Sequence, residues 1–294
     1  MPRVDVVLLT MNDRPAEEAL AQKTLLDQAE VEVRVVVVGN GRVPQVVPPG
    51  ALTVALPENI GIPGGRNAGA DALRRAGSPA EYLFFLDNDA CLPRPDVLAR
   101  LIAAAEEHPD AAYVQPRLTG PDDTTTPRRW VPRLRASDPG RPGTITTMTE
   151  GVVLIRRSVF DQVGGWECSL FLYHELTCLD WAYRCWSAGY SGWYAADIRM
   201  HHPVTSPTRH RLFWRLAARN RIAVAYRNLP GPLIPLYLTV WTVITLARAL
   251  RGGGVGESLG GMREGRARRS EQQRRPMSWR TVWRLTKAGR PPVI

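Results

Sequence analysis

Two carboxylates stand one residue apart in Asp87-Asn88-Asp89, directly after the apolar run 84–86. A buried strand that ends in such a pair places it at the carboxyl edge of a sheet, where α/β proteins bind ligands. Carboxylate oxygens are the ligands that a hard divalent cation prefers, and such a cation can bridge to a diphosphate. The spacing therefore predicts a metal-assisted phosphate site at Asp87 and Asp89, and the alternative for so short a motif is a solvated turn.

A glycine-rich run occupies residues 59–69 and includes Gly64-Gly65-Arg66. Glycines let a backbone approach a ligand closely, and the guanidinium of Arg66 can donate to two phosphate oxygens at once. The run is neither the G-x-G-x-x-G pattern of a dinucleotide fold nor a P-loop, since no Gly-Lys-Ser/Thr follows. It therefore argues against a dehydrogenase and against a P-loop NTPase.

Strand-like and helix-like segments alternate through the first 203 residues. Short β-branched or apolar runs predict strands, and longer periodic stretches predict helices. This alternation is typical of βαβ units and predicts an α/β fold with a mostly parallel sheet flanked by helices. The predicted strands are 4–10, 31–38, 52–56, 82–86, 111–118, 150–155 and 193–196, and the predicted helices are 16–28, 66–76, 95–107, 157–163 and 179–188, with a long loop at 120–143.

The last 91 residues have a different pattern and predict a helical, basic extension. An amphipathic helix is predicted at 208–227, where Arg211, Arg215 and Arg219 share one face. Residues 228–247 carry no charge, but prolines interrupt their start and leave too few residues to cross a bilayer. We therefore expect this segment to lie on a membrane or to pack on protein. A flexible linker is predicted at 252–261, followed by a basic, tryptophan-containing segment to residue 294.

The net charge of +10 is distributed unevenly. Residues 204–294 carry 18 Arg and Lys and 3 acids, so the first 203 residues are mildly acidic. A basic segment favours a polyanionic neighbour, which is nucleic acid or an anionic membrane. Arginines of the 208–227 helix could hold lipid headgroups, and Tyr237, Trp241, Trp279 and Trp283 suit a membrane interface. The four cysteines form no C-x-x-C pair and no signal peptide is evident, so we expect reduced thiols in a cytoplasmic protein.

Further motifs accompany the carboxylate pair and the glycine-rich run along the first 203 residues. In chain order the set is Thr10-Met11-Asn12, Gly39-Asn40-Gly41, the run 58–69, Phe85-Leu86-Asp87-Asn88-Asp89, the run 151–157, Val163-Gly164-Gly165-Trp166 and Phe171-Leu172-Tyr173-His174-Glu175. This ordered set resembles family 2 glycosyltransferases over about residues 3–203, and it is far more specific than any one motif.

This resemblance implies a GT-A fold and an inverting transferase that uses a nucleotide-diphospho-sugar. Asp87, Asn88 and Asp89 would then frame a divalent cation, Mg²⁺ or Mn²⁺, and the diphosphate. A histidine after the last strand, His201 or His202, would complete the metal site or contact the diphosphate. Because adjacent strand residues point to opposite faces, at most one of the two is expected to do so. Donor-lining residues would be Thr10, Asn12, Gly39, Asn40, Asn59, Gly65 and Arg66.

The sequence departs from the family pattern at the expected catalytic base. Many members have Glu-Asp after the aromatic run, where this chain has Glu175-Leu176. Inverting transfer needs a carboxylate to accept the proton of the acceptor hydroxyl. Two candidates stay open, Glu175 itself and Asp180 in the following helix, and Glu175 is preferred. Many members also have an acidic residue in the second turn, where this chain has Gly39-Asn40-Gly41, so the base of the nucleotide is not fixed.

The leading hypothesis divides the chain into a GT-A catalytic domain at 1–203 and a helical basic extension at 204–294. The enzyme would glycosylate a glycan, lipid-linked or small-molecule acceptor while bound peripherally to the inner face of the cell membrane. One alternative is a sugar-phosphate nucleotidyltransferase, which usually begins with a glycine-rich loop that this chain lacks after its first strand. A nucleic-acid-binding protein ranks last, because it gives the carboxylate and glycine motifs no role.

Overall fold

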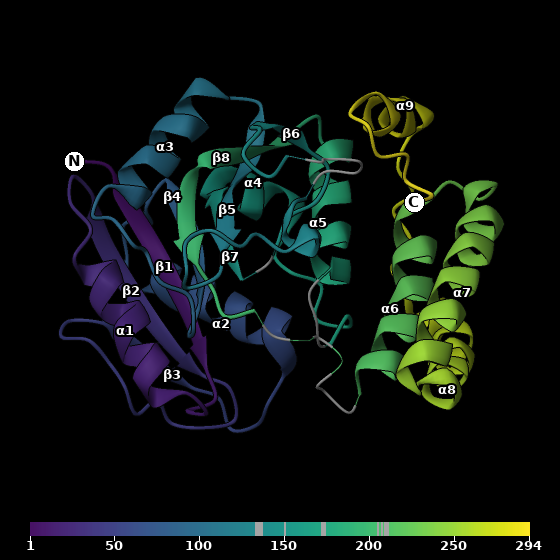
Figure 1. The fold of residues 1–294 in the computed structure, drawn as a ribbon, viewed down its shortest axis with the longest axis horizontal. Coiled ribbons are helices and arrows are strands. Elements are labelled where there is room, and N and C mark those ends of the chain that lie inside the picture. Colours follow the sequence, from purple (N-terminus) through teal and green to yellow (C-terminus); the bar gives the residue numbers. More distant parts are fainter. Residues whose placement is uncertain (133–137, 150, 172–174, 205, 207, 209–211) are drawn as a thin grey trace.

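The computed structural model describes residues 1–294 except 133–137, 150, 172–174, 205, 207, 209–211 and the side chain of Glu175. An eight-stranded sheet forms the centre of residues 1–203 (Figure 1). Its strands are β1 (Arg3–Thr10), β2 (Glu32–Gly39), β3 (Leu52–Ala55), β4 (Tyr82–Asp87), β5 (Ala111–Thr119), β6 (Gly143–Ile145), β7 (Val152–Arg156) and β8 (Ser191–His201).

The strand order is β3-β2-β1-β4-β7-β5-β8-β6. Strands β3, β2, β1 and β4 are parallel to one another, and β5 is parallel to β8. Strand β7 is antiparallel to β4 and β5, and β6 is antiparallel to β8. The sheet is therefore mixed and mostly parallel, which confirms the predicted fold class.

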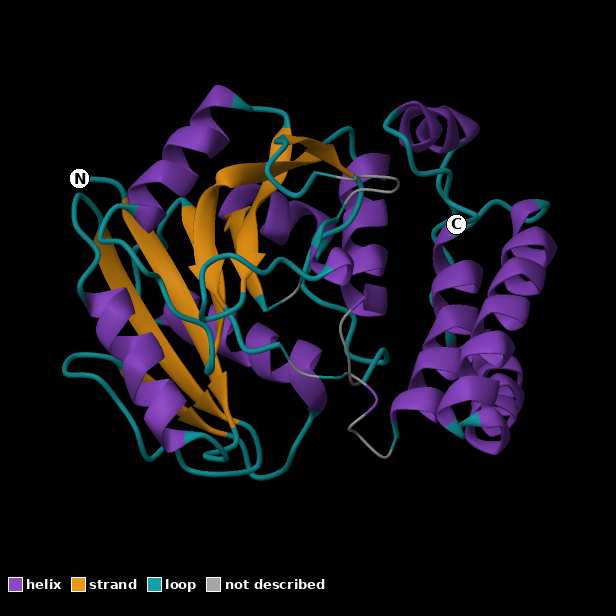
Figure 2. Ribbon diagram, in the orientation of Figure 1, coloured by secondary structure: helices purple, strands orange, loops and turns teal. Residues whose placement is uncertain are grey.

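Helices cover both faces of the sheet, as Figure 2 shows by colour. Side chains of the first face pack with Leu25 of α1 (Pro15–Leu26) and Leu101 of α3 (Val97–Glu107). Those of the opposite face pack with Leu73 of α2 (Gly61–Arg75), Phe160 of α4 (Arg157–Val163) and Trp181 of α5 (Glu175–Ser187). Strands β1, β2 and β4 are buried on both sides, which explains their continuous apolar runs.

The C-terminal part is a helical bundle that packs against α5 (Figures 1 and 2). It comprises α6 (Phe213–Asn228), α7 (Leu233–Gly252), α8 (Val255–Ala267), η3 (Arg268–Glu271) and α9 (Trp279–Lys287), and the earlier loop contains η1 (Arg128–Trp130). Leu179 and Tyr183 of α5 share one apolar cluster with Val224 of α6 and Leu285 of α9. The predicted helical extension is thus observed, while the domain boundary between 203 and 204 stays a prediction.

The prediction of a flexible linker at 252–261 was wrong, because α8 begins at Val255. Its glycines allow close helix packing instead. A Cβ on Gly261 would lie 2.0 Å from the Arg215 carbonyl oxygen of α6, and one on Gly265 would lie 2.9 Å from the Arg219 carbonyl oxygen. Small residues at this contact therefore let the backbones of α6 and α8 approach each other.

Three other segments differ in length from the prediction. Helix α2 begins at Gly61 and α5 at Glu175, earlier than expected. The last strand, expected at 193–196, runs from Ser191 to His201 because it pairs with β5 along its length and with β6 at its start. These corrections extend α2, α5 and β8 toward the same edge of the sheet.

Candidate active site

The carboxyl ends of three parallel strands bring the predicted site residues together. In the strand register Thr10 of β1 is opposite Gly39 of β2, and Leu9 is opposite Asp87 of β4. The turns after these strands contain the Asn12, Asn40 and Asp89 side chains. Parallel pairing therefore places residues that are far apart in the sequence at one edge of the sheet, as their positions at strand ends predicted.

The carboxylates of Asp87 and Asp89 are held among cationic side chains. Arg66 of α2 donates from Nη2 to Asp87 Oδ1 over 2.7 Å, and Arg66 is almost wholly buried. Arg14, from the loop after β1, forms a short ion pair with Asp89. The Asp89 side chain is only 9% exposed and that of Asp87 is 33% exposed. Both carboxylates are thus partly shielded from water. Electrostatic interactions are stronger in such a site than in bulk water.

His202 joins these two carboxylates. Its Nε2 lies 3.5 Å from Asp87 Oδ2 and 3.3 Å from Asp89 Oδ1. Its Nδ1 lies 2.9 Å from the Pro203 carbonyl oxygen, so the Nδ1 proton is donated there and Nε2 faces the carboxylates. Burial lowers the pKa of His202, but the two carboxylates outweigh burial and raise that pKa above its ordinary value.

The three side chains fit a divalent cation. One ligand atom from each of Asp87, Asp89 and His202 lies within 4.8 Å of the other two. Two carboxylate oxygens and an imidazole nitrogen suit Mn²⁺, and Mg²⁺ favours the oxygens. The bond from His202 Nδ1 to Pro203 fixes the ring, which is how proteins orient histidine ligands.

His201 lies apart from this group, although it is adjacent in the sequence. Its Nε2 is 3.2 Å from Asp123 Oδ1 in the loop after β5. The backbone of His201 is the last position of β8, so its ring and that of His202 diverge. The expectation that at most one histidine approaches the carboxylates agrees with this placement, and His202 is the one that does.

Gly151 closes one side of the carboxylate site. Its carbonyl accepts the Asp87 N–H over 2.7 Å, and a Cβ at Gly151 would lie 1.9 Å from Asp87 Oδ2. Any side chain there would displace the carboxylate. Gly151 and Arg14 were not predicted as site residues, because nothing in the sequence indicates that either would contact Asp87 or Asp89.

The predicted donor-lining residues lie beside the carboxylates, at the same edge of the sheet. The Thr10 hydroxyl donates to Glu18 Oε2 over 2.6 Å and accepts the Asn12 N–H over 3.0 Å. Asn12 has a φ of +58°, a left-handed conformation that asparagine tolerates, and its amide donates to the Val43 carbonyl. Burial raises the pKa of Glu18. Thr10 and Asn12 thus shape the turn after β1.

Asn40 and Asn59 connect two further turns of this edge. Asn40 Nδ2 donates to Asn59 Oδ1 over 2.9 Å and to the Gly61 carbonyl over 3.2 Å. Asn40 Oδ1 accepts the Ile60 N–H over 3.0 Å. These bonds hold the start of α2 against the end of β2, where Gly39, Asn40 and Asn59 are predicted to line the nucleotide-sugar donor.

Two predicted glycines have steric reasons for being glycine. A Cβ on Gly39 would lie 2.0 Å from the Arg42 carbonyl oxygen, and one on Gly65 would lie 2.4 Å from the Leu9 side chain. Gly39 therefore permits a tight turn, and Gly65 permits α2 to pack closely on β1. Asn88 is partly exposed and its amide lies 3.5 Å from Asp13 Oδ1. Contact of these residues with a donor stays a prediction.

The two candidate bases lie in very different surroundings. Glu175 is the first residue of α5, and its side chain and residues 172–174 lie outside the described part of the chain. Asp180 is fully buried in the same helix. Its Oδ1 accepts bonds from Arg227 Nε over 2.9 Å and Asn228 Nδ2 over 2.7 Å, and its Oδ2 accepts one from Arg184 over 3.1 Å.

These contacts stabilise the charged form of Asp180. Burial raises its pKa, but Arg184, Arg227 and Asn228 outweigh burial and hold the pKa below its ordinary value. A carboxylate with three donors around it is a weak proton acceptor. The geometry therefore gives Asp180 a structural task, which is to join α5 to α6.

The fold and the site together define a class of protein. A mostly parallel α/β sheet with paired carboxylates at its carboxyl edge is the arrangement of a GT-A domain. Residues 23–164 match the family profile described as glycosyl transferase family 2. Residues 23–164 therefore belong to a family 2 glycosyltransferase domain.

Solved glycosyltransferase structures share the fold. TarS 1–349 of S. aureus matches with a TM-score of 0.51 and 15% identity over 75% of this chain and 65% of that one. The mannosyltransferase PcManGT of Pyrobaculum calidifontis, solved with GDP-Man and Mn²⁺, matches with a TM-score of 0.56 and 18% identity over 97% of this chain and 79% of that one. GalNAc-T7, solved with UDP, GalNAc and Mn²⁺, matches with a TM-score of 0.60 and 12% identity over 92% of this chain and 58% of that one.

These likenesses concern the fold, because the identities are low. The chain spans less than two thirds of the TarS 1–349 and GalNAc-T7 chains. No curated protein sequence matches the chain. The particular reaction of this chain is therefore argued below from its own site.

Proposed function

We propose that the chain is an inverting glycosyltransferase that moves a sugar from a nucleotide-diphospho-sugar to an acceptor hydroxyl. The observation that carries the proposal is the group of Asp87, Asp89 and His202 at the end of β4, beside the Asn40 and Asn59 turns. Two structural neighbours were solved with Mn²⁺ and a nucleotide or nucleotide sugar, which supports the same pairing of metal and donor.

A divalent cation bound to Asp87, Asp89 and His202 would offset negative charge on the diphosphate. The chain's own cations add to this effect, because Arg66 and Arg14 lie beside the same carboxylates. Fixed positive charges stabilise a leaving group whose negative charge grows as the bond to the sugar breaks. Such groups act most strongly in a partly dehydrated site, and Arg66 is almost wholly buried.

Glu175 is proposed as the base that accepts the proton of the acceptor hydroxyl. Asp180 is saturated by Arg184, Arg227 and Asn228, so it is the weaker candidate. In a single displacement the acceptor oxygen bonds to the anomeric carbon on the face opposite the diphosphate. The hydroxyl proton passes to the carboxylate as this bond forms, and the nucleoside diphosphate leaves with the electron pair.

A panel of UDP-, GDP- and dTDP-sugars tests this function. With Mg²⁺ or Mn²⁺ we expect the purified chain to hydrolyse one donor slowly in the absence of acceptor and to release the nucleoside diphosphate. Pyrophosphate release from a nucleoside triphosphate and a sugar phosphate would instead favour a nucleotidyltransferase. If no nucleotide sugar binds even with metal, the proposal is wrong.

The helical extension is proposed to hold the enzyme on the inner face of the cell membrane, where a lipid-linked acceptor would lie. Helix α7 continues from Leu233 to Gly252 with Pro235 in its first turn, so the expectation that this segment is too short to cross a membrane was wrong. By length and composition α7 could cross a membrane, and 17% of its most apolar window is buried. Its exposed Leu236, Val243 and Leu250 recur every seven residues and thus share one helix face. Residues 204–294 carry a net charge of +15, which favours an anionic surface.

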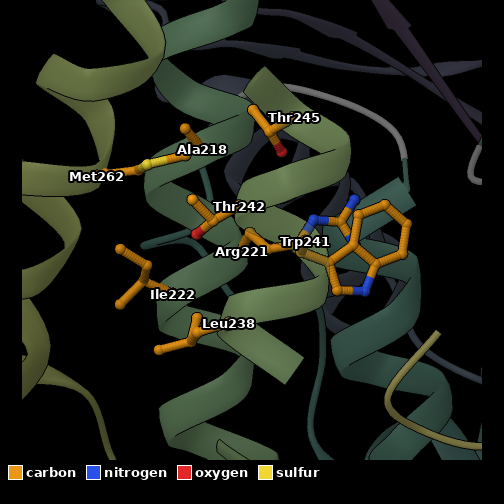
Figure 3. Close-up of a pocket in the computed structure, with 8 residues that line it drawn as sticks. All are labelled: Ala218, Arg221, Ile222, Leu238, Trp241, Thr242, Thr245 and Met262. Carbon is orange, nitrogen blue, oxygen red and sulfur yellow. The ribbon is translucent and has the colours of Figure 1, made fainter. Parts of the chain in front are cut away.

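Several residues that the sequence analysis assigned to a membrane interface pack inside the bundle. Tyr237 and Trp241 are buried, and the Arg221 guanidinium lies 3.5 Å from the centre of the Trp241 ring (Figure 3). Arg215 and Arg219 both bind Glu264 of α8, whereas Arg209 and Arg211 lie outside the described residues. Trp279 and Trp283 are exposed and stay candidates for lipid contact.

Vesicle binding tests the membrane proposal. Replacing Leu236, Val243 and Leu250 together by Ser is expected to weaken co-sedimentation with phosphatidylglycerol vesicles at least about tenfold, because each apolar side chain contributes about 1.5 kcal/mol or more when buried. The matched control replaces Leu20 and Leu26 of α1, which are similarly exposed, and should bind as wild type. Equal binding of both variants would contradict the proposal.

A further inference from the structure

Residues 166–171 lead directly toward the proposed base and are fixed on one side by α2. The Asn67 side chain accepts the Trp166 N–H at Oδ1 over 2.9 Å. Its Nδ2 donates to the Trp166 carbonyl over 2.8 Å. Asn67 follows Arg66, which binds Asp87, so one turn of α2 contacts both the carboxylate site and this segment.

Helix α6 of the extension holds the same segment from its other side. Arg219 Nη2 lies 3.3 Å from the Ser169 carbonyl oxygen and 3.4 Å from that of Phe171. Asn220 Nδ2 donates to the Phe171 carbonyl over 3.3 Å. Arg227 Nη2 lies 2.6 Å from Glu167 Oε2. Three residues of α6 therefore contact a segment that precedes Glu175.

The orientation of Asn220 is itself specified. Asn220 is 1% exposed, and its Oδ1 accepts a bond from Arg219 Nε over 2.9 Å. Arg219 is held by Glu264 of α8, at 3.3 Å from Nη1 to Oε1. With Oδ1 bonded to Arg219, the amide turns its Nδ2 toward Phe171. A buried amide in such a network is directional, since each lost bond leaves a buried polar group without its partner.

Phe171 connects α6 to the proposed donor pocket. Its ring lies against the start of α2, where a Cβ on Gly61 would be 2.7 Å from Phe171 Cδ2. The Gly61 carbonyl accepts a bond from Asn40, one of the predicted donor-lining residues. The Phe171 backbone thus meets α6 while its ring meets the turn beside the nucleoside site.

The described residues before and after 172–174 are both bonded to α6. Phe171 precedes them and is bonded to Asn220, while α5 follows them and is joined to α6 through the bonds from Arg227 and Asn228 to Asp180. We propose that Arg219 and Asn220 are positioning residues, which set the place of residues 166–171 and hence of Glu175 relative to the donor. This inference rests on the proposed function, and it makes the extension part of the active-site framework.

Asn220→Asp tests the inference with the full chain. The carboxylate keeps the acceptor for Arg219, which preserves the fold, but has no N–H for the Phe171 carbonyl and repels it. We expect kcat to fall about 10- to 100-fold, since a displacement of about 1 Å costs as much. The KM for the donor and the Kd for nucleoside diphosphate should stay within about twofold of wild type. Hydrogen exchange of amides in 166–176 should become faster.

Two further variants separate positioning from general stability. Asn220→Leu keeps the number and branching of the side-chain heavy atoms, removes both hydrogen-bonding groups, and should reproduce the loss of kcat. Arg215→Ala removes the other α6 arginine on Glu264, which is more exposed, and should leave kcat and exchange unchanged. The inference is overturned if Asn220→Asp retains kcat, if Arg215→Ala loses as much, or if the loss matches a fall in the folded fraction. A wild-type chain that binds no nucleotide would instead overturn the proposed function.

Discussion

Replacing Asp89 by Asn is expected to lower kcat by about 10²–10³-fold, the effect of removing one key electrostatic group from an active site. Asp89 is a carboxylate of the proposed metal group, and its oxygens contact Arg14 and His202. An amide keeps the shape but loses the charge that a divalent cation requires. The measurement is the release of nucleoside diphosphate from the donor at saturating metal.

The matched control is Asp197→Asn. Asp197 lies in β8 and its side chain is 67% exposed, where it pairs with Arg100. A surface pair of this kind contributes little to stability, so this variant should keep wild-type kcat. Full activity of Asp89→Asn would contradict the assignment of the carboxylate pair to metal and diphosphate.

Glu175→Gln is expected to lower the turnover rate, whereas Asp180→Asn is expected to lower the stability of the fold. Glu175→Gln should lower kcat about 10²–10⁴-fold, which is the contribution of a general base, and should leave the melting temperature unchanged. Asp180→Asn should reduce the free energy of unfolding by about 3–5 kcal/mol, because it removes the buried negative charge that pairs with both Arg227 and Arg184. The folded fraction of that variant should still turn over. Steady-state kinetics and thermal unfolding measure both effects.

The pH dependence of stability gives a second readout for Asp180. Because its pKa is lowered in the folded chain, its stabilising effect is present above the ordinary carboxylate pKa and is lost as the pH falls through the folded pKa. Asp180→Asn should remove that part of the acid sensitivity. If Asp180→Asn abolishes turnover without loss of stability while Glu175→Gln remains active, then Asp180 is the base.

The sheet could be predicted because its signal is local. The β1, β2 and β4 segments are continuous apolar runs, as expected for strands buried on both faces, and each ends in a polar turn. Parallel strands with polar ends must share one edge, so the meeting of Thr10, Asn40 and Asp87 followed from the order of the segments alone.

The extension was harder to predict because tertiary contacts decide its structure. The glycines at 252–261 resemble a linker, but Gly261 is in contact distance of the α6 backbone. Tyr237 and Trp241 have the composition of an interface belt, yet they pack against α6 and α5 in the same cluster. A single sequence does not indicate which helix will cover them.

Some residues of the candidate site could likewise be predicted from local sequence, whereas others depend on tertiary contacts. Asp87 and Asp89 were expected at a metal site from their strand-end position, whereas a histidine after β8 was expected from the family resemblance, which did not decide between His201 and His202. The contacts of Gly151, Arg14 and Asn220 depend on segments brought together only by the fold. Two of the three partners of Asp180, Arg227 and Asn228, likewise come from α6, 47 and 48 residues away in the sequence, so its structural task could not be inferred from spacing.

Titration of the full chain with UDP, GDP and dTDP, each with and without Mn²⁺, tests the central claim most directly. We expect one nucleoside diphosphate to bind at least about tenfold more tightly with Mn²⁺, which corresponds to about 1.4 kcal/mol. Asp89→Asn should abolish that difference. The account is contradicted if no nucleoside diphosphate binds, or if binding is equal with and without metal in both proteins.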